Sequence, residues 1–500
     1  MPARRLELAA VAPDRLAVAL ERLRADLDLD PHVPPDVLAE AETVAADPPG
    51  PVPDVDATDL PLVTIDPPGS RDLDQALHIQ PDGDGYLVRY AIASLATFVV
   101  PGGAIDAEVH RRGVTVYGPA GSYPLHPEPL STGAASLLPD ADRPVYLWHL
   151  RLGADGALLD ARVELAVVRS RAQLTYAQVQ AAHDDGARLP PGVPEHLPAL
   201  LREVGELRRA QERARGGVSL DIPEQRVEQN ETGYVLTHRK TLPAEEWNAQ
   251  VSLLTGMAAA QLMIEAGVGV LRTLPPADPR DLDRLRRTAR SLEIDWPPDT
   301  GYGEVLASLD SAVPAHAAFL DAATTLFRGA GYQVFGTDSE ETGNTQDAGA
   351  TGDGEHARHA AIAAHYGHVT APLRRLVDRY GLEICRAHCA GEKIPTWVGE
   401  ALPGLPATMA AATRRANAYE RGAVDALEAL LLEPHLGEEF TGVVLEAGTP
   451  EDSVQTGIVA IGAHAVEGRV RGPELPVGER VRVRLVDVDV AARRVRFELV

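Results

Sequence analysis

The sequence predicts an α+β fold, with a strand-rich half, then a helical half, then a small β-barrel. Between residues 58 and 170, short apolar or alternating runs are separated by Gly and Pro, as expected for strands joined by turns. From about residue 176 the apolar residues recur with the period of an α-helix. After residue 440 the period returns to two. Strands followed by helices within one unit are typical of an α+β domain.

Residues 1–57 are predicted to form a small helical region with a linker. Residues 14–27 are strongly periodic, and Pro35 opens a second predicted helix at 37–45. The Pro/Gly-rich residues 48–53 then break the helical pattern. This region is either a helix-turn-helix module that binds nucleic acid or a helical appendage that packs on the next domain.

Residues 58–434 are predicted to form the central domain. Its predicted strands share apolar or alternating patterns and cover residues 62–65, 86–93, 115–117, 145–152 and 161–168. Its predicted helices are amphipathic and cover residues 197–215, 244–266, 279–291, 303–325, 357–366, 371–391 and 407–432. Residues 336–354 are rich in Gly, Thr, Asp and Glu without periodicity, so we expect a loop or insertion there.

Residues 435–500 contain five short segments of period two. That is the size of an OB-fold barrel, which often binds single-stranded nucleic acid. Arg482 and Arg484 alternate along one predicted strand, so they share a face on which they could follow RNA phosphates. The alternative is an ordinary solvated face of a half-buried sheet.

Composition limits the partners of the protein. The net charge is −26 over 500 residues, which argues against binding polyanions over the whole surface and favours a local channel for nucleic acid. Two cysteines, Cys385 and Cys389, are too few for a disulfide framework or a zinc cage. No apolar run is long enough for a membrane helix, and no signal-peptide pattern or nucleotide-binding Gly motif is found. We therefore expect a cytoplasmic, monomeric protein without a membrane partner or nucleotide cofactor.

Three aspartates surround a turn after the apolar run at 62–65. Asp66 ends the run, a Pro-Pro-Gly sequence turns the chain, and Asp72 and Asp74 follow. Carboxylates this close repel one another unless a cation lies between them, and oxygen ligands favour Mg²⁺. Asp is also a common turn and helix-capping residue, so the metal site is a hypothesis that needs its structural context.

Several distant stretches, taken in order, match one known pattern. They are Thr64-Ile65-Asp66 with Arg71-Asp72-Leu73-Asp74, Ala91-Ile92-Ala93, and the stretches 111–117, 127–131, 136–139, 172–176, 220–224 and 366–375. This ordered set resembles the ribonuclease II (RNB) family of exoribonucleases over roughly residues 58–430. The resemblance implies an RNB-type catalytic domain preceded by the helical region and followed by the barrel. The cold-shock barrels that usually precede this domain are not found, so the chain resembles a short member of the family.

The resemblance implies a 3′-to-5′ exonuclease of single-stranded RNA that depends on Mg²⁺, with Mn²⁺ as an alternative, and that releases nucleoside 5′-monophosphates. Divalent metal held by carboxylates can activate water and stabilise a leaving oxygen. On this basis Asp66, Asp72, Asp74 and Gln75 are the expected metal-binding residues, and Asp74 is also an expected catalytic residue.

The same resemblance assigns residues that contact RNA. Arg374 matches the family arginine at the scissile phosphate, where a guanidinium can grip non-bridging oxygens, and Arg375 is expected to contact RNA beside it. Tyr117 matches a tyrosine that borders the end of the RNA path. Glu420 matches a glutamate near the 3′ nucleotide and is an expected catalytic residue. The alternatives are surface ion pairs for Arg374 and Glu420 and a half-buried core position for Tyr117.

The chain departs from the family pattern at several places. One is the stretch 272–278, where some members have an aromatic that stacks on the terminal base and this chain has Pro275, Pro276 and Ala277. Gln75 stands where the family usually has a fourth aspartate, and an amide brings no charge to a metal. Ala371 replaces a serine, and Gln250 and Gly256 replace the usual residues of one helix. These departures leave open a second interpretation, an RNA-binding or regulatory protein on a nuclease scaffold with weakened catalysis. A third is an acidic scaffold that binds a protein through the barrel.

Overall fold

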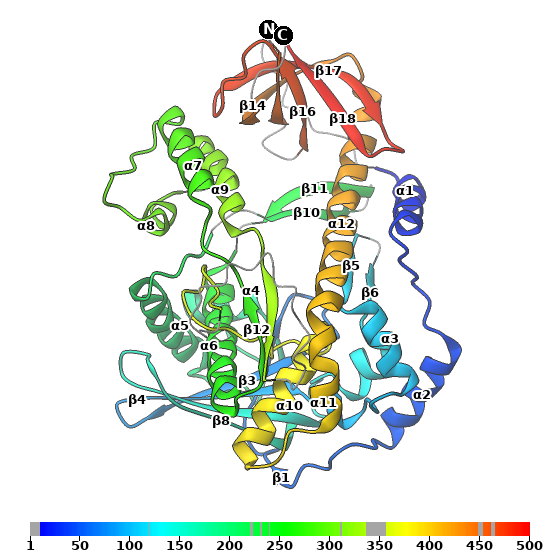
Figure 1. Cartoon of the computed structure of the whole chain (residues 1–500), viewed down its shortest axis with the longest axis vertical. Coiled ribbons are helices and arrows are strands. Elements are labelled where there is room, and N and C mark those ends of the chain that lie inside the picture. Colours follow the sequence, from blue (N-terminus) through cyan, green and yellow to red (C-terminus); the bar gives the residue numbers. More distant parts are fainter. Residues whose placement is uncertain are drawn as a thin grey trace.

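A computed structural model describes residues 11–119, 121–220, 224–230, 233–239, 241–310, 313–336, 357–448, 454–461 and 466–500. It confirms the α+β architecture, with N-terminal helices, a strand-rich and then helical central domain, and a C-terminal barrel (Figure 1). Residues 337–354 of the expected loop and residues 221–223 of one family stretch lie outside the described residues.

The two predicted N-terminal helices are present as α1 (Pro13–Asp26) and α2 (Pro35–Ala46). Each begins at a proline, which suits the first helical turn because the missing N–H has no partner there. Leu16, Leu20 and Leu23 of α1 are buried against the long helix α12 (Leu405–Leu432), whereas α2 packs on α3 (Ala104–Arg112). Both helices are therefore packed on the rest of the protein.

A five-stranded sheet forms the base of the central domain. Its order is β1-β8-β7-β4-β3, and every pair except β1–β8 is antiparallel. The strands are β1 (Val55–Asp56), β3 (Gln75–Asp82), β4 (Gly85–Ala93), β7 (Asp142–Leu152) and β8 (Leu158–Arg169). Strand β3 was not expected from the sequence because polar residues and Pro81 interrupt its pattern, which an edge strand tolerates.

Three helices cover the sheet and carry much of the core: α5 (Leu197–Ala214), α6 (Pro243–Ala266) and α10 (Leu376–Ala390). The smaller strand pairs are β2 (Thr64–Asp66) with β9 (Gln173–Thr175), β5 (Val116–Gly118) with β6 (Gly121–Tyr123), β10 (Glu224–Asn230) with β11 (Gly233–Arg239), and β12 (Gly269–Thr273) with β13 (Gly331–Phe335). The remaining helices are α4 (Tyr176–Asp185), α7 (Pro279–Ser291), α8 (Tyr302–Ala307), α9 (Pro314–Ala323) and α11 (Thr396–Ala401).

Two helix predictions were wrong, and a third began too early, because the helix expected at 371–391 starts only at Leu376. The expected helix at 303–325 is divided into α8 and α9, because Pro314 starts a new helix and lacks the N–H that a continuous helix needs. The expected helix at 357–366 is irregular. Its backbone instead bonds to the segment that ends β12, through Ala360 N–H to the Leu274 carbonyl and Arg272 N–H to the Tyr366 carbonyl.

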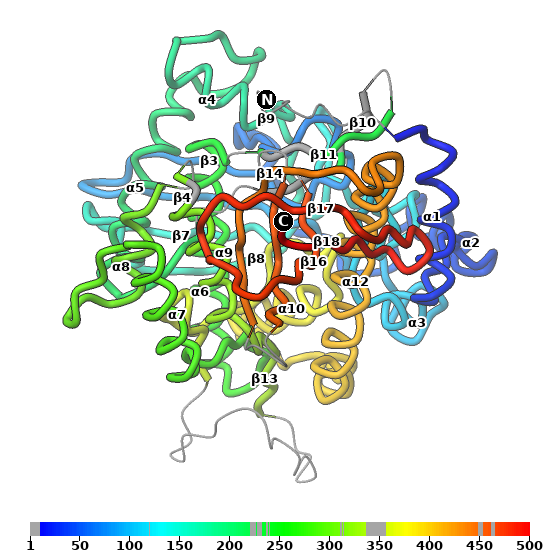
Figure 2. Tube along the Cα trace, turned by 90° about the horizontal axis from the view of Figure 1, so that it is seen from above, coloured from blue at the N-terminus to red at the C-terminus, as the bar shows by residue number. Residues whose placement is uncertain are grey.

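The C-terminal region is a closed barrel of five strands, as expected. Its order is β14-β15-β16-β18-β17, with β14 (Glu439–Ala447), β15 (Gln455–Ile461), β16 (Val466–Gly472), β17 (Arg480–Asp489) and β18 (Arg494–Leu499). Ala429 and Leu432, at the end of α12, belong to its core. Viewed along the long axis, the barrel lies over the middle of the central domain (Figure 2). Among the described helices, none combines the length and apolar character needed to cross a bilayer.

Candidate active site

The carboxylate turn, residues 66–74, connects β2 to β3. Gly69 has φ +83°, a conformation that glycine adopts without strain. The hydroxyl of Ser136 accepts a hydrogen bond from Leu73 N–H at 3.0 Å and donates one to the Arg71 carbonyl at 2.6 Å. These bonds hold the backbone on both sides of Asp72 and so determine where Asp72 and Asp74 lie.

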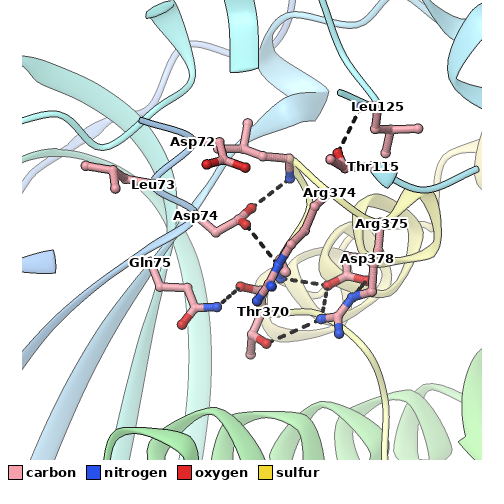
Figure 3. Close-up of polar contacts among 12 residues, drawn as sticks. Asp72, Leu73, Asp74, Gln75, Thr115, Leu125, Thr370, Arg374, Arg375 and Asp378 are labelled. Carbon is pink, nitrogen blue, oxygen red and sulfur yellow. Dashed lines mark hydrogen bonds and ion pairs between the residues drawn. The ribbon is translucent and has the colours of Figure 1, made fainter. Parts of the chain in front are cut away.

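The arginine loop, residues 370–375, lies against the carboxylate turn (Figure 3). The Leu373 N–H donates to Oδ1 of Asp74 at 2.7 Å, and Nε of Arg374 lies 3.5 Å from Oδ2 of the same carboxylate. The Arg374 carbonyl accepts a hydrogen bond from Thr115 N–H at 3.0 Å. Asp74 is 5% exposed, whereas the Arg374 side chain is 47% exposed. Two of the three predicted catalytic residues, Asp74 and Arg374, are thus adjacent although they are far apart in the sequence, and the guanidinium remains accessible.

Arg375 points to a different partner. Its guanidinium donates two hydrogen bonds to the carboxylate of Asp378 on α10, at 2.9 and 2.7 Å, and Asp378 is fully buried. The same carboxylate accepts a hydrogen bond from the Ala371 N–H, which lies 2.7 Å from its Oδ2. Arg375 therefore joins the arginine loop to α10. Its expected contact with RNA stays a prediction.

Tyr117 lies at the edge of the carboxylate turn. Its hydroxyl donates to Oδ2 of Asp72 at 3.0 Å, and its side chain is 49% exposed on β5. A tyrosine held at its hydroxyl with an open ring face can stack on a base. This placement brings Tyr117 together with Asp72, Asp74 and Arg374.

Burial makes the carboxylates of this site costly to ionise. It raises the pKa of Asp74 to about 7, although the charge of Arg374 and the Leu373 N–H act in the opposite direction. Burial also raises the pKa of Asp66 to about 6, against the lowering effect of the Arg374 charge. Positive charge beside these groups would favour their ionised forms.

The oxygen atoms of these carboxylates suit a hard cation that would take most of its ligands from water and substrate. Among the described residues, no three His, Cys, Asp or Glu side chains are grouped closely enough to hold a metal ion. Mg²⁺, however, usually takes one or two carboxylates and completes its shell with water and substrate phosphate. Oδ2 of Asp66 is buried without a hydrogen-bond partner, as expected of an oxygen that a cation would satisfy. The residues therefore fit a divalent cation shared between the protein and a phosphate.

Gln75 is the first residue of β3, and both ends of its amide have protein partners. Nε2 donates to the Thr370 carbonyl at 2.5 Å, and Oε1 accepts hydrogen bonds from the hydroxyls of Tyr90 and Ser252. Its predicted role as a metal ligand is not supported by any contact with the three aspartates among the described residues.

The remaining predicted residues lie elsewhere. Glu420 is exposed on α12 and makes no hydrogen bond or ion pair with the other predicted residues in the described part of the chain. Arg482 and Arg484 are exposed on β17, as expected, and both pair with Glu439 of β14. The arginine face of the barrel is therefore partly neutralised by its own carboxylate.

His126 also supports the site and was not expected from the sequence. It is buried, and its Nδ1 lies 3.2 Å from the Leu373 carbonyl. A carbonyl can only accept, so Nδ1 carries the proton and donates. Burial lowers the pKa of His126 to about 4, more than this bond raises it. Only its place directly before the family stretch 127–131 could have drawn attention to it.

Comparison with known proteins identifies two domains. Residues 55–388 match the family model of the RNB domain, and residues 438–500 match that of the RNase II-type exonuclease C-terminal S1 domain. Ribonuclease R of Escherichia coli (strain K12) is 26% identical over 489 residues, which are 89% of this chain and 57% of that protein. The chain thus spans little more than half the length of this curated relative.

Solved structures share the fold. Mycoplasma genitalium RNase R in complex with ribose methylated single-stranded RNA has a TM-score of 0.83 and 20% identity, covering 97% of this chain and 78% of that one. Yeast Ssd1, described as a pseudonuclease, has a TM-score of 0.68 and 14% identity, covering 97% and 58%. Because an RNB domain model matches well over half of the residues and an S1 domain follows it, the chain belongs to the RNB-domain family of RNase II/R exoribonucleases.

Proposed function

We propose that this protein is a 3′-to-5′ exoribonuclease that hydrolyses single-stranded RNA to nucleoside 5′-monophosphates. The observation that carries the proposal is the contact between Arg374 and the buried Asp74, 3.5 Å apart, at the junction of the arginine loop and the carboxylate turn. A buried carboxylate beside an accessible guanidinium suits a phosphate that bridges a cation and an arginine.

The aspartates would hold Mg²⁺ or Mn²⁺, through the buried carboxylate of Asp74 and the half-buried carboxylates of Asp66 and Asp72. When bound, the cation supplies the charge that makes water nucleophilic and stabilises the leaving oxygen. Water adds to phosphorus and the bond to the 3′-oxygen of the preceding nucleotide breaks. The released nucleotide keeps the phosphate on its 5′-oxygen, and the shortened RNA ends in a 3′-hydroxyl.

Arg374 would act on the phosphate itself. Its guanidinium is accessible and lies beside the Asp74 carboxylate, while the Thr115 N–H holds its backbone carbonyl. A planar guanidinium can donate to two non-bridging oxygens and offset the charge that builds up during hydrolysis. Tyr117 would border the terminal base, because its hydroxyl is anchored to Asp72 while half of its side chain stays exposed.

The RNA partner is supported by relatives and by the barrel. Mycoplasma genitalium RNase R has been solved with single-stranded and with double-stranded RNA. In this chain Arg482 and Arg484 would follow the RNA backbone. RNA phosphates would compete with the Glu439 carboxylate for the two guanidinium groups. Arg375 would contact RNA only after rearrangement, because its guanidinium is held by Asp378. A catalytic role for Glu420 is not part of the proposal, because Glu420 makes no hydrogen bond or ion pair with the other site residues in the described part of the chain.

The test is incubation of the purified protein with 5′-labelled RNA across Mg²⁺ and Mn²⁺ titrations. We expect a shortening ladder that ends in a short stub, and nucleoside 5′-monophosphates as products. Arg374→Ala should lower the rate by roughly 10²- to 10³-fold, and Arg374→Lys by less because the charge remains. Arg188→Ala, at an exposed position between α4 and α5, is the matched control. Absence of degradation at all metal concentrations would refute the proposal.

The second candidate is an RNA-binding protein on the same scaffold with weakened catalysis. It is favoured by Gln75, whose amide replaces a family carboxylate and has only protein partners, and the fold alone does not decide because a pseudonuclease shares it. Under this candidate the wild type retains RNA without shortening it, and Asp74→Asn changes neither property.

A further inference from the structure

The side chain of Gln75 connects several parts of the fold at the edge of the candidate active site. Strand β3 carries Gln75, strand β4 carries Tyr90, helix α6 carries Ser252, and Thr370 begins the arginine loop. The Tyr90 and Ser252 hydroxyls lie 2.8 Å apart, and Ser252 Oγ lies 3.3 Å from Gln75 Oε1. Tyr90 is 1% exposed, so its hydroxyl has no access to bulk water and depends on these partners.

The chemistry of these partners determines which way the amide points. The Thr370 carbonyl can only accept a hydrogen bond, so the atom that faces it at 2.5 Å must be the NH₂ group of Gln75 (Figure 3). The other end then presents a carbonyl oxygen to two hydroxyl donors. A carboxylate at this position would offer no donor to Thr370 and would place negative charge against its carbonyl.

The bond from Gln75 to Thr370 completes the attachment of the arginine loop. Asp378 accepts from the Ala371 N–H, Asp74 accepts from the Leu373 N–H, and Thr115 donates to the Arg374 carbonyl. Gln75 supplies the contact at the first residue of the loop. Without it, Asp74 would be the one described residue near the start of β3 that bonds to the segment preceding Arg374.

We propose that Gln75 is a positioning residue that holds the arginine loop against β3 and thereby places Arg374, and that it is not a ligand of the divalent cation. The proposal rests on the proposed function for its effect on the reaction, because Arg374 must act on the RNA phosphate for its placement to matter. The attachment of the loop itself does not depend on catalysis.

Two substitutions separate positioning from metal binding. Gln75→Leu keeps a similar volume and removes every hydrogen bond, whereas Gln75→Glu keeps an acceptor for Tyr90 and Ser252 but loses the donor to Thr370. If Gln75 positions the loop, both variants lower kcat at least tenfold, keep KM for RNA within about threefold, and leave the half-saturating Mg²⁺ concentration within about twofold. If Gln75 binds the cation, the added carboxylate of Gln75→Glu lowers that concentration and Gln75→Leu raises it.

Hydrogen exchange provides a measurement without catalysis. Peptides covering residues 370–375 should exchange at least tenfold faster in both variants than in the wild type, without added Mg²⁺. Gln80→Leu on the same strand, where the Gln80 side chain bonds only to Arg89 among the described residues, is the matched control and should leave this exchange unchanged. Should Gln75→Leu fail to fold, Tyr90→Phe, which removes one of the hydroxyls that hold the amide, replaces it and should show smaller changes in the same direction.

Opposite shifts of the half-saturating Mg²⁺ concentration in the two variants, or unchanged exchange of residues 370–375, would overturn the positioning role. A wild-type protein that degrades no RNA refutes the proposed function instead. In that case the exchange measurement still decides whether Gln75 holds the loop.

Discussion

Replacing Asp74 by Asn tests the electrostatics of the candidate active site. Asn has nearly the same shape, and its Oδ1 can still accept the hydrogen bond that Leu373 N–H donates at 2.7 Å. The substitution removes the negative charge that faces Arg374 and would hold the cation. We therefore expect RNA shortening to be lost while RNA binding is retained.

The same substitution should stabilise the metal-free protein at alkaline pH. Burial raises the pKa of Asp74 from 3.8 to about 7, so the folded state holds this proton more tightly than the unfolded state. The resulting stabilisation is present below about pH 4 and is lost as the pH rises towards 7. This difference between the pKa of Asp74 in the folded and unfolded states corresponds to about 4 kcal/mol of stability. The folded-state pKa of about 7 already includes the favourable interaction with Arg374. At pH 8 Asp74→Asn should therefore be up to about 4 kcal/mol more stable than the wild type.

Chemical denaturation in a chelator, at pH 8 and at pH 4, measures this difference. Trp148 is fully buried in the five-stranded sheet, so tryptophan fluorescence reports unfolding of the central domain. The variant should have the higher denaturation midpoint at pH 8 and nearly the wild-type midpoint at pH 4. Mg²⁺ should stabilise the wild type more than the variant, because binding to the folded state adds to its stability.

Asp59→Asn is the control, because Asp59 is exposed and its carboxylate keeps its hydration in the folded state. It should leave the midpoints and RNA shortening unchanged. The electrostatic reasoning is refuted if Asp74→Asn is no more stable than the wild type at pH 8 without metal. Continued RNA shortening by Asp74→Asn would refute the catalytic assignment.

Three further outcomes follow from other contacts. Because burial lowers the pKa of His126 from 6.5 to about 4, the unfolded state binds more protons at this group in that range, and the His126 contribution to stability should fall by up to about 3 kcal/mol as the pH falls from 6.5 to 4. The contributions of Asp74 and Asp66 run in the opposite direction over this range, so the measured quantity is the difference in unfolding free energy between the wild type and His126→Leu in denaturant titrations. Gly256→Ala would place a Cβ 2.1 Å from Cε2 of Tyr366. It should therefore lower the unfolding free energy by about 1–3 kcal/mol, although Ala has the better helix propensity. An unchanged melting temperature would contradict this close contact. Replacing Arg482 and Arg484 by Ala should reduce the salt dependence of RNA binding by a slope of about 1.4 if each contacts one phosphate, and an identical slope would exclude the barrel face from the RNA path.

Much of the fold could be predicted from local patterns. The helices α1, α5 and α12 and the barrel strands have regular apolar periodicity, which depends only on which face of each element is buried. Strand β3 and the residues at 357–366 do not follow this rule. Polar residues interrupt β3 at the sheet edge. The alanine-rich segment 357–366 forms turns within itself and bonds to the segment that ends β12 in place of a continuous helix, so neighbours distant in sequence override local preference.

Short motifs in a fixed order are enough to recognise the family, and they name Asp66, Asp72, Asp74, Arg374 and Tyr117 as candidates for one site. Which of these side chains contact one another depends on the folded chain. The fold placed Arg374 against Asp74 and Tyr117 against Asp72, and it gave Arg375, Gln75 and the barrel arginines protein partners of their own. A motif determines which groups each of its side chains is able to bind. The groups that a side chain does bind come from other segments, and only folding brings those segments within about 3 Å of one another.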